Sequence, residues 1–158
     1  MMAAKHFIND PTQLVLSALK AVPYTNPHCA VDVDNKTVYL KKPASSQVNV
    51  VSGGGAGHEP SFSAFVGPGL LSAAVSGTIF ASPSAEQVRQ CLFERVDSAK
   101  GVLVVVMNYT GDVLSVLILH TLQYSTNRAF IATSAWLSKR PEQQACKWRW
   151  SSWAMTPV

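Results

Sequence analysis

Residues 48–60 read Val48-Asn49-Val50-Val51-Ser52-Gly53-Gly54-Gly55-Ala56-Gly57-His58-Glu59-Pro60 in a chain of 158 residues. The branched residues Val48, Val50 and Val51 predict a buried strand, because such side chains fit a pleated surface. We expect the strand to stop at Ser52 and a glycine loop to follow over residues 53–57. Glycines can take positive φ and bring bare N–H groups against a ligand, so the stretch predicts a concave nest of amides.

The residues that follow the glycines argue against phosphate as the ligand. A P-loop needs Lys and Ser or Thr after its last glycine, where this chain has His58 and Glu59, and dinucleotide spacing needs a glycine at position 58. A carboxylate and an imidazole suit a neutral polyol or carbonyl compound, whose hydroxyls need both donors and acceptors. The structural alternative is a tight strand-to-helix turn with His58 at its edge.

Length and cysteine usage restrict the class of protein. A chain of 158 residues suits one domain of ordinary size. Cys29, Cys91 and Cys146 are widely spaced and odd in number, which favours reduced thiols in a cytosolic setting over disulfides or a zinc site. The first ten residues lack the apolar core of a secretory signal, and no stretch approaches the roughly 18 continuous apolar residues of a membrane helix. We therefore expect a cytoplasmic protein without a membrane partner.

The formal net charge of +4 arises from 13 Lys and Arg against 9 Asp and Glu. Residues 1–114 contain 8 of each sign, so the whole excess (5 − 1 = +4) lies in residues 115–158. A balanced front portion suits a globular enzyme with a small substrate. The tail also contains all four tryptophans, and its Lys147-Trp148-Arg149-Trp150 run resembles a basic-aromatic nucleic-acid stripe. No flanking fold presents that run, so we expect no nucleic-acid partner.

The order of the remaining elements predicts the fold class. Asp10-Pro11 predicts a helix start, with a helix that Pro23 and Pro27 end. Further predictions are a short strand over residues 37–40, helical segments over 62–66 and 70–75, a strand over 78–81, a capped helix that begins at Ser84 and ends just before Gly101, and a strand over 102–107. A strand, helix, strand, helix, strand order indicates an α/β protein with an open, mostly parallel sheet and flanking helices.

Two polar segments follow predicted strands of this sheet. His58 comes after the first strand, and Asp112 comes after the strand over 102–107. Ligands of open parallel sheets bind outside the carboxyl ends of the strands, so we expect His58 and Asp112 to face one cavity. The structural alternative for Asp112 is the N-cap of a helix.

Three ordered motifs carry a family resemblance. Ser52 to Pro60, Ile79-Phe80-Ala81-Ser82-Pro83 and Asn108-Tyr109-Thr110-Gly111-Asp112-Val113-Leu114 together resemble the N-terminal, substrate-binding domain of dihydroxyacetone (glycerone) kinases. Lys5 to Asp10 also looks like the opening of that domain. The resemblance implies that residues 5–114 form an incomplete, N-terminal part of the domain. Residues 115–158 depart from it, and we interpret them as a divergent tail that is out of frame or disordered.

The resemblance also implies roles for individual residues. Gly55, Ala56, Gly57 and His58 match the loop that contacts dihydroxyacetone, with His58 also assisting proton movement. Asp112 matches the catalytic carboxylate, which takes the proton of the attacking hydroxyl. Position 107 belongs to the binding set as well, and this chain has Met107 where many members have lysine. The implied substrate is dihydroxyacetone, with glyceraldehyde as a second possibility, and no metal ligand is expected here.

Two parts of the family's machinery are not found in the sequence. Relatives hold the substrate covalently on a histidine in a Gly-Ile-His-Gly-Glu-like context, and they bind Mg–ATP on a separate helical domain. The resemblance therefore implies Mg–ATP and a homodimer for full-length relatives, and we expect no cofactor on this chain. It further implies that the chain is a truncated, inactive form of an ATP-dependent dihydroxyacetone kinase; the alternative is a non-catalytic dihydroxyacetone-binding or regulatory fragment.

Overall fold

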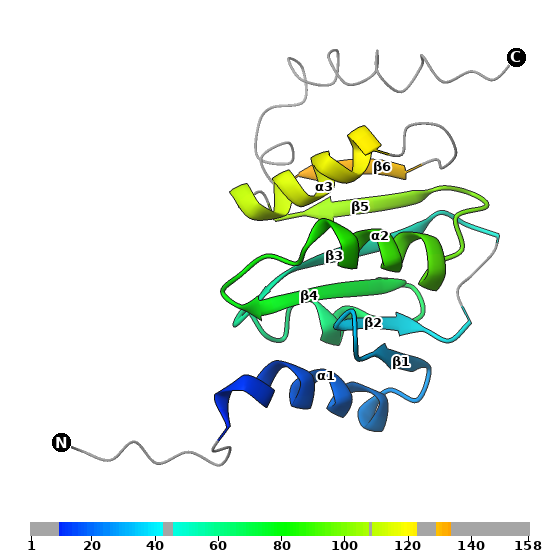
Figure 1. Cartoon of the computed structure of the whole chain (residues 1–158). Coiled ribbons are helices and arrows are strands. Elements are labelled where there is room, and N and C mark those ends of the chain that lie inside the picture. Colours follow the sequence, from blue (N-terminus) through cyan, green and yellow to red (C-terminus); the bar gives the residue numbers. More distant parts are fainter. Residues whose placement is uncertain (1–9, 43–45, 108, 123–128, 134–158) are drawn as a thin grey trace, which may run out of the picture.

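Residues 10–42, 46–107, 109–122 and 129–133 are described in a computed structural model, and they form one open sheet of six strands (Figure 1). In spatial order the strands are β1 (Cys29–Asp32), β2 (Thr37–Leu40), β4 (Ala73–Ile79), β3 (Asn49–Ala56), β5 (Val102–Val106) and β6 (Ala129–Thr133). Strands β4, β3, β5 and β6 are parallel, whereas β2 is antiparallel to both β1 and β4. The predicted α/β class with an open, mostly parallel sheet is confirmed.

Two hydrophobic clusters cover the two faces of the sheet. On one face lie α2 (Ala85–Gln90), the π-helical turn η3 (Cys91–Arg95) and α3 (Thr110–Leu122), packed on Val51, Val75 and Val104 (Figure 1). On the other face α1 (Leu14–Thr25) and the segment around η2 (Ser63–Phe65) pack on Val38 and Ala74. Alternation of side chains along each strand supplies both clusters. None of the helices in the described ranges is long and apolar enough to span a membrane.

The first helix begins as predicted and ends later than predicted. Asp10 caps the short η1 (Pro11–Gln13) by accepting a hydrogen bond of 2.9 Å from the Thr12 N–H, and α1 follows directly. The prediction that Pro23 ends this helix is wrong, because Pro23 lies inside α1. A proline in the last turn removes only one N–H, and the Asn26 N–H still donates to the Val22 carbonyl at 2.8 Å.

The predicted helical segment over residues 70–75 is wrong, because β4 runs from Ala73 to Ile79 at the centre of the sheet. Ala73 and Ala74 have high helix propensity. Both are fully buried, with one packed on each face of the sheet. Burial against two layers outweighs local propensity here. The strand predicted over residues 78–81 therefore starts and ends too late.

The predicted glycine loop is also largely part of a strand. Strand β3 continues through Gly53, Gly54 and Gly55 to Ala56. A Cβ at Gly53 would clash with the Val75 carbonyl oxygen, and a Cβ at Gly55 would lie 2.9 Å from the Ala81 nitrogen. The glycines are needed because neighbouring backbone approaches β3 closely. Only Gly57, with a φ of 112°, occupies a turn.

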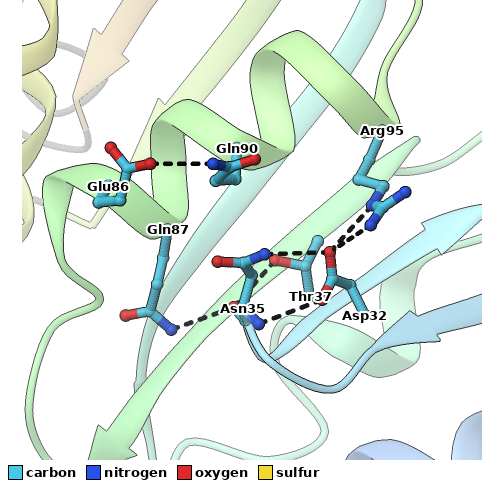
Figure 2. A network of polar contacts seen from close by, with 7 residues as sticks. All are labelled: Asp32, Asn35, Thr37, Glu86, Gln87, Gln90 and Arg95. Atoms are coloured by element: carbon cyan, nitrogen blue, oxygen red, sulfur yellow. Dashed lines mark hydrogen bonds and ion pairs between the residues drawn. The ribbon is translucent and has the colours of Figure 1, made fainter.

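A polar network fastens the β1–β2 turn to the helices above it (Figure 2). Arg95 forms an ion pair of 2.8 Å with the buried Asp32, and Gln87 donates to the Asn35 carbonyl at 3.0 Å. Burial opposes ionisation of Asp32, but hydrogen bonds from Asn35 and Arg95 outweigh it and lower the Asp32 pKa. Gln87 also completes the predicted capping box with Ser84, which is confirmed.

The described cysteines, Cys29 and Cys91, are free and buried. Burial, followed by the nearby charge of Asp32, raises the pKa of the Cys91 thiol to about 12. Cys91 is therefore protonated and unreactive at neutral pH. Cys146 lies outside the described residues, as do the Lys147–Trp150 run and the other tryptophans of the predicted tail.

The predicted boundary after residue 114 falls within α3. The first residues beyond that boundary are packed into the domain, since Val116 is buried in the same cluster as Val104. The boundary and the reading-frame origin of the tail stay predictions.

Candidate functional site

Three aromatic side chains meet where three parallel strands end. His58 follows β3, Phe80 follows β4 and Tyr109 follows β5. The ring centroids of His58 and Tyr109 are 6.0 Å apart with an interplanar angle of 22°, and those of His58 and Phe80 are 6.2 Å apart at 76°. This is the carboxyl edge at which open parallel sheets bind ligands.

A short turn presents His58 at this edge. The Gly57 N–H donates a hydrogen bond of 2.9 Å to Oε2 of Glu59, and the Ser61 N–H donates to the His58 carbonyl at 3.1 Å. The Phe80 N–H donates to the Ala56 carbonyl at 2.8 Å and ties the turn to the end of β4. Because residues 53–56 belong to β3 and the Gly57 N–H is already bonded, the nest of free amides predicted over residues 53–57 is not formed as such.

Asp112 lies in the first turn of α3 on the segment that follows β5. The residue is only 5% exposed, yet neither carboxylate oxygen has a hydrogen-bond partner among the described residues. Because α3 begins at Thr110, the alternative of Asp112 as its N-cap is wrong. The dipole of the helix favours a negative charge at this position. A buried carboxylate with unfilled acceptor sites is costly unless a donor reaches it.

Contacts that the sequence did not predict hold the first turn of α3 in place. The Ser115 hydroxyl donates to the Pro83 carbonyl at 2.9 Å. A Cβ at Gly111 would lie 2.6 Å from Oγ of Ser82, so only glycine allows this approach. The sole sequence signal was a serine on an otherwise apolar helical stretch, which is too weak to indicate a contact with residue 83.

Met107 lies near the glycine-rich end of β3. A Cβ at Gly54 would lie 3.5 Å from the Met107 sulfur and 3.1 Å from the ring of Phe62. Phe62 belongs to the cluster on the α1 face, so Met107 lies toward that face. Among the predicted binding residues, Gly55 and Ala56 are thus in β3, Gly57 and His58 in the turn, Met107 just beyond β5, and Asp112 in α3.

The described residues do not fit a Mg–ATP site. They contain no group of three or more His, Cys, Asp or Glu side chains that could hold a metal ion. The glycines that would cradle phosphates are strand residues, and the Gly57 N–H already donates to Glu59. The chain segments that follow β3 and β5 instead contribute an imidazole, His58, and a buried carboxylate, Asp112.

Comparison with curated proteins finds dihydroxyacetone kinases. The chain is 44% identical over 114 residues to dihydroxyacetone kinase 1 of Saccharomyces cerevisiae, covering 72% of this chain and 19% of that protein. It is 39% identical over 115 residues to the dihydroxyacetone-binding subunit DhaK of a PTS-dependent kinase from Lactococcus lactis, covering 72% and 34%. The chain thus spans about a fifth to a third of the length of these relatives.

The fold is also similar to solved structures of a dihydroxyacetone kinase and of a related co-activator. The dihydroxyacetone kinase from C. freundii in complex with AMP-PNP and Mg2+ superposes with a TM-score of 0.74 at 32% identity, over 83% of this chain and 25% of that one. A dihydroxyacetone kinase operon co-activator, DhaQ, superposes with a TM-score of 0.66 at 28% identity, over 75% and 36%.

The family assignment rests on a match that covers most of the sheet. A family model described as the Dak1 domain matches residues 20–126, from within α1 to beyond α3. The chain belongs to the dihydroxyacetone kinase family and contains part of its Dak1 domain.

Proposed function

We propose that this chain binds dihydroxyacetone at the carboxyl edge of β3, β4 and β5, as the substrate-binding part of an ATP-dependent dihydroxyacetone kinase. The observation that carries the proposal is the buried Asp112 carboxylate, whose two oxygens lack partners among the described residues. A hydroxyl donor from a ligand would satisfy them and remove the cost of burying an unpaired charge. Dihydroxyacetone has two hydroxyls and a carbonyl, which suit an acceptor and a donor side by side.

The roles within the site follow from the chemistry of each group. Asp112 accepts the hydroxyl proton, as the base does in phosphoryl transfer. His58 donates to a ligand oxygen, and stacking on Tyr109 holds its ring in orientation. Gly55, Ala56 and Gly57 provide backbone close to the ligand, and Met107 adds an apolar contact near Gly54. Mg–ATP supplies the phosphoryl group, and the described residues do not bind it.

We further propose that the chain alone binds substrate without turning it over. The described residues provide a hydroxyl acceptor but no metal cluster. A non-catalytic, regulatory binding role is the second candidate. The similarity to the DhaQ structure favours it, because that protein is a co-activator of a dihydroxyacetone kinase operon.

Calorimetric titration of the 158-residue chain with dihydroxyacetone tests binding. We expect saturable heat with the wild type and an affinity roughly tenfold or more weaker for Asp112→Leu, which removes the charged acceptor. Glu86→Gln is the matched control, because Glu86 is an exposed carboxylate on α2 that pairs with Arg89. The absence of heat at millimolar ligand would contradict the binding proposal.

A coupled assay for dihydroxyacetone phosphate separates the two candidate functions. With Mg–ATP we expect no product from the purified chain, and turnover by this chain alone would contradict that expectation. In a full-length relative that carries these front residues, Asp112→Asn should lower kcat more than it raises KM, since a base acts mainly in the transition state. An unchanged kcat would remove Asp112 from the mechanism.

A further inference from the structure

We propose that Glu59 is a positioning residue that fixes His58 in its place between Phe80 and Tyr109. The sequence reading treats the Glu59 carboxylate as a group that faces the ligand, and the structure gives that carboxylate a different partner. Its Oε2 accepts a hydrogen bond of 2.9 Å from the Gly57 N–H. This bond joins the two residues on either side of His58, whose ring must be oriented. The inference rests on the proposed role of His58 in binding.

The geometry of the turn makes this hydrogen bond decisive for the imidazole. Gly57 has a φ of 112°, a conformation that only glycine adopts readily. A side chain at this position would also meet the Phe80 ring at 2.5 Å. A glycine has no side chain to hold its own torsions, so the Glu59 carboxylate supplies the restraint from two residues ahead.

Two further contacts place His58 at the centre of the restrained turn. The Ser61 N–H donates to the His58 carbonyl at 3.1 Å, which closes the turn on its far side. The imidazole then lies edge-on to Phe80 and parallel to Tyr109. Such ring contacts are individually weak, so they reinforce an orientation that the turn has set.

The property that Glu59 supplies is a hydrogen-bond acceptor at the right distance. Glu59 is exposed, so its negative charge is well solvated and acts weakly at a distance. An amide oxygen at the same place can also accept the Gly57 N–H. The proposal therefore separates Glu59→Gln, which keeps the acceptor, from Glu59→Ala, which removes it.

The test records the imidazole proton resonances of His58 by NMR in the ligand-free chain. In the wild type the parallel Tyr109 ring shifts these resonances away from their free-histidine positions. We expect Glu59→Ala to return them toward free-histidine values and Glu59→Gln to retain the wild-type shift. Glu59→Lys, which also lacks an acceptor, should behave like Glu59→Ala. Glu86→Ala removes an exposed carboxylate elsewhere and should change nothing at His58.

A wild-type shift retained in Glu59→Ala and Glu59→Lys would overturn the proposal, and so would loss of the shift in Glu59→Gln. A general effect on stability would lower Tm without moving His58 selectively, so Tm is recorded for each variant. Because the readout needs no ligand, it is independent of whether dihydroxyacetone binds. If dihydroxyacetone binds, the same variants should also differ in their affinity for it. We expect an affinity roughly three- to tenfold weaker in Glu59→Ala and unchanged in Glu59→Gln.

Discussion

The imidazole of His58 lies nearly parallel to the phenol ring of Tyr109, with the two centroids 6.0 Å apart. These residues are separated by 51 positions (109 − 58), and they meet because β3 and β5 are adjacent and parallel. The contact joins the glycine-rich segment to the segment that carries Asp112. It is therefore the most direct evidence that both halves of the proposed site share one edge of the sheet.

Replacing Tyr109 should weaken ligand binding through His58. We expect Tyr109→Ala to lower the affinity for dihydroxyacetone about three- to tenfold, because the stacked ring is worth roughly 0.5–1.5 kcal/mol. Tyr109→Phe keeps the ring and should bind like the wild type. Calorimetry on the three proteins checks the prediction. Equal affinities for Tyr109→Ala and the wild type would mean that the stacking does not orient His58.

Replacing Asp112 should stabilise the ligand-free chain while impairing function. The carboxylate is buried without a described partner, so removing its charge should raise the free energy of unfolding by about 1 kcal/mol in Asp112→Asn and by more in Asp112→Leu. Such a gain is typical of a strained functional position. Urea unfolding measures it, with Asp97→Asn as the control. A loss of stability in both Asp112 variants would show that the carboxylate serves the fold.

Adding a methyl group at Gly53 should disrupt the centre of the sheet. A Cβ there would clash with the Val75 carbonyl, where β3 pairs with β4, so we expect Gly53→Ala to cost roughly 3 kcal/mol or more. The matched control is Gly67→Ala, whose Cβ would meet only Asn26 Nδ2 at 3.6 Å. That control should cost less than about 1 kcal/mol. Similar unfolding free energies for the two variants would contradict the close approach of these strands.

The Asp32–Arg95 pair should make the free energy of unfolding depend on pH in the acid range. Although burial opposes ionisation, hydrogen bonds from Asn35 and Arg95 lower the Asp32 pKa below its ordinary value of 3.8. A lowered pKa means that the stabilisation is present above pH 3.8 and is lost as the pH falls through the lower, folded-state value.

The Arg95→Met variant tests this pair directly. It should destabilise the chain by roughly 1–2 kcal/mol at pH 7, since Arg95 is itself partly exposed and solvent screens the pair. The difference from the wild type should shrink as the pH is lowered below 3.8. Urea unfolding across a pH series measures the free energy of unfolding of the wild type and of the variant. The control is Arg89→Met, which removes the exposed Glu86–Arg89 pair. A difference that stays constant down to pH 2.5 would contradict the assignment.

Features with a local chemical cause could be predicted from the sequence. The Asp10 cap, the Ser84–Gln87 capping box and the strand of valines over 102–106 depend on neighbours within a few residues. One further rule, that the ends of parallel strands meet, placed the segments after β3 and β5 at one edge of the sheet. These signals sufficed for the fold class and for that shared edge, whereas the contact between His58 and Tyr109 was not predicted.

Features that depend on distant backbone could not be predicted. Gly53 is a strand residue because Val75 lies against it, and Ala73 and Ala74 are strand residues because two layers bury them. No neighbouring residue in the sequence indicates the approach of Val75 to Gly53 or the burial of the two alanines. The partner of Glu59 was missed for a related reason, since a carboxylate next to a histidine reads equally well as a ligand contact. The roles assigned to Gly55, Ala56, Met107 and Asp112 stay predictions until binding is measured.

The side chain of Gln87 links three parts of the molecule through a single amide, whose bond to Asn35 is shown in Figure 2. Its oxygen accepts the Ser84 N–H at the start of α2, and its nitrogen donates to the carbonyls of Asn35 and Ser76. A carboxylate at this position, as in Gln87→Glu, would replace that donor with a second oxygen facing two carbonyls. One side-chain nitrogen therefore couples the hairpin, the central strand and the start of α2, so that loss of this donor would loosen all three together.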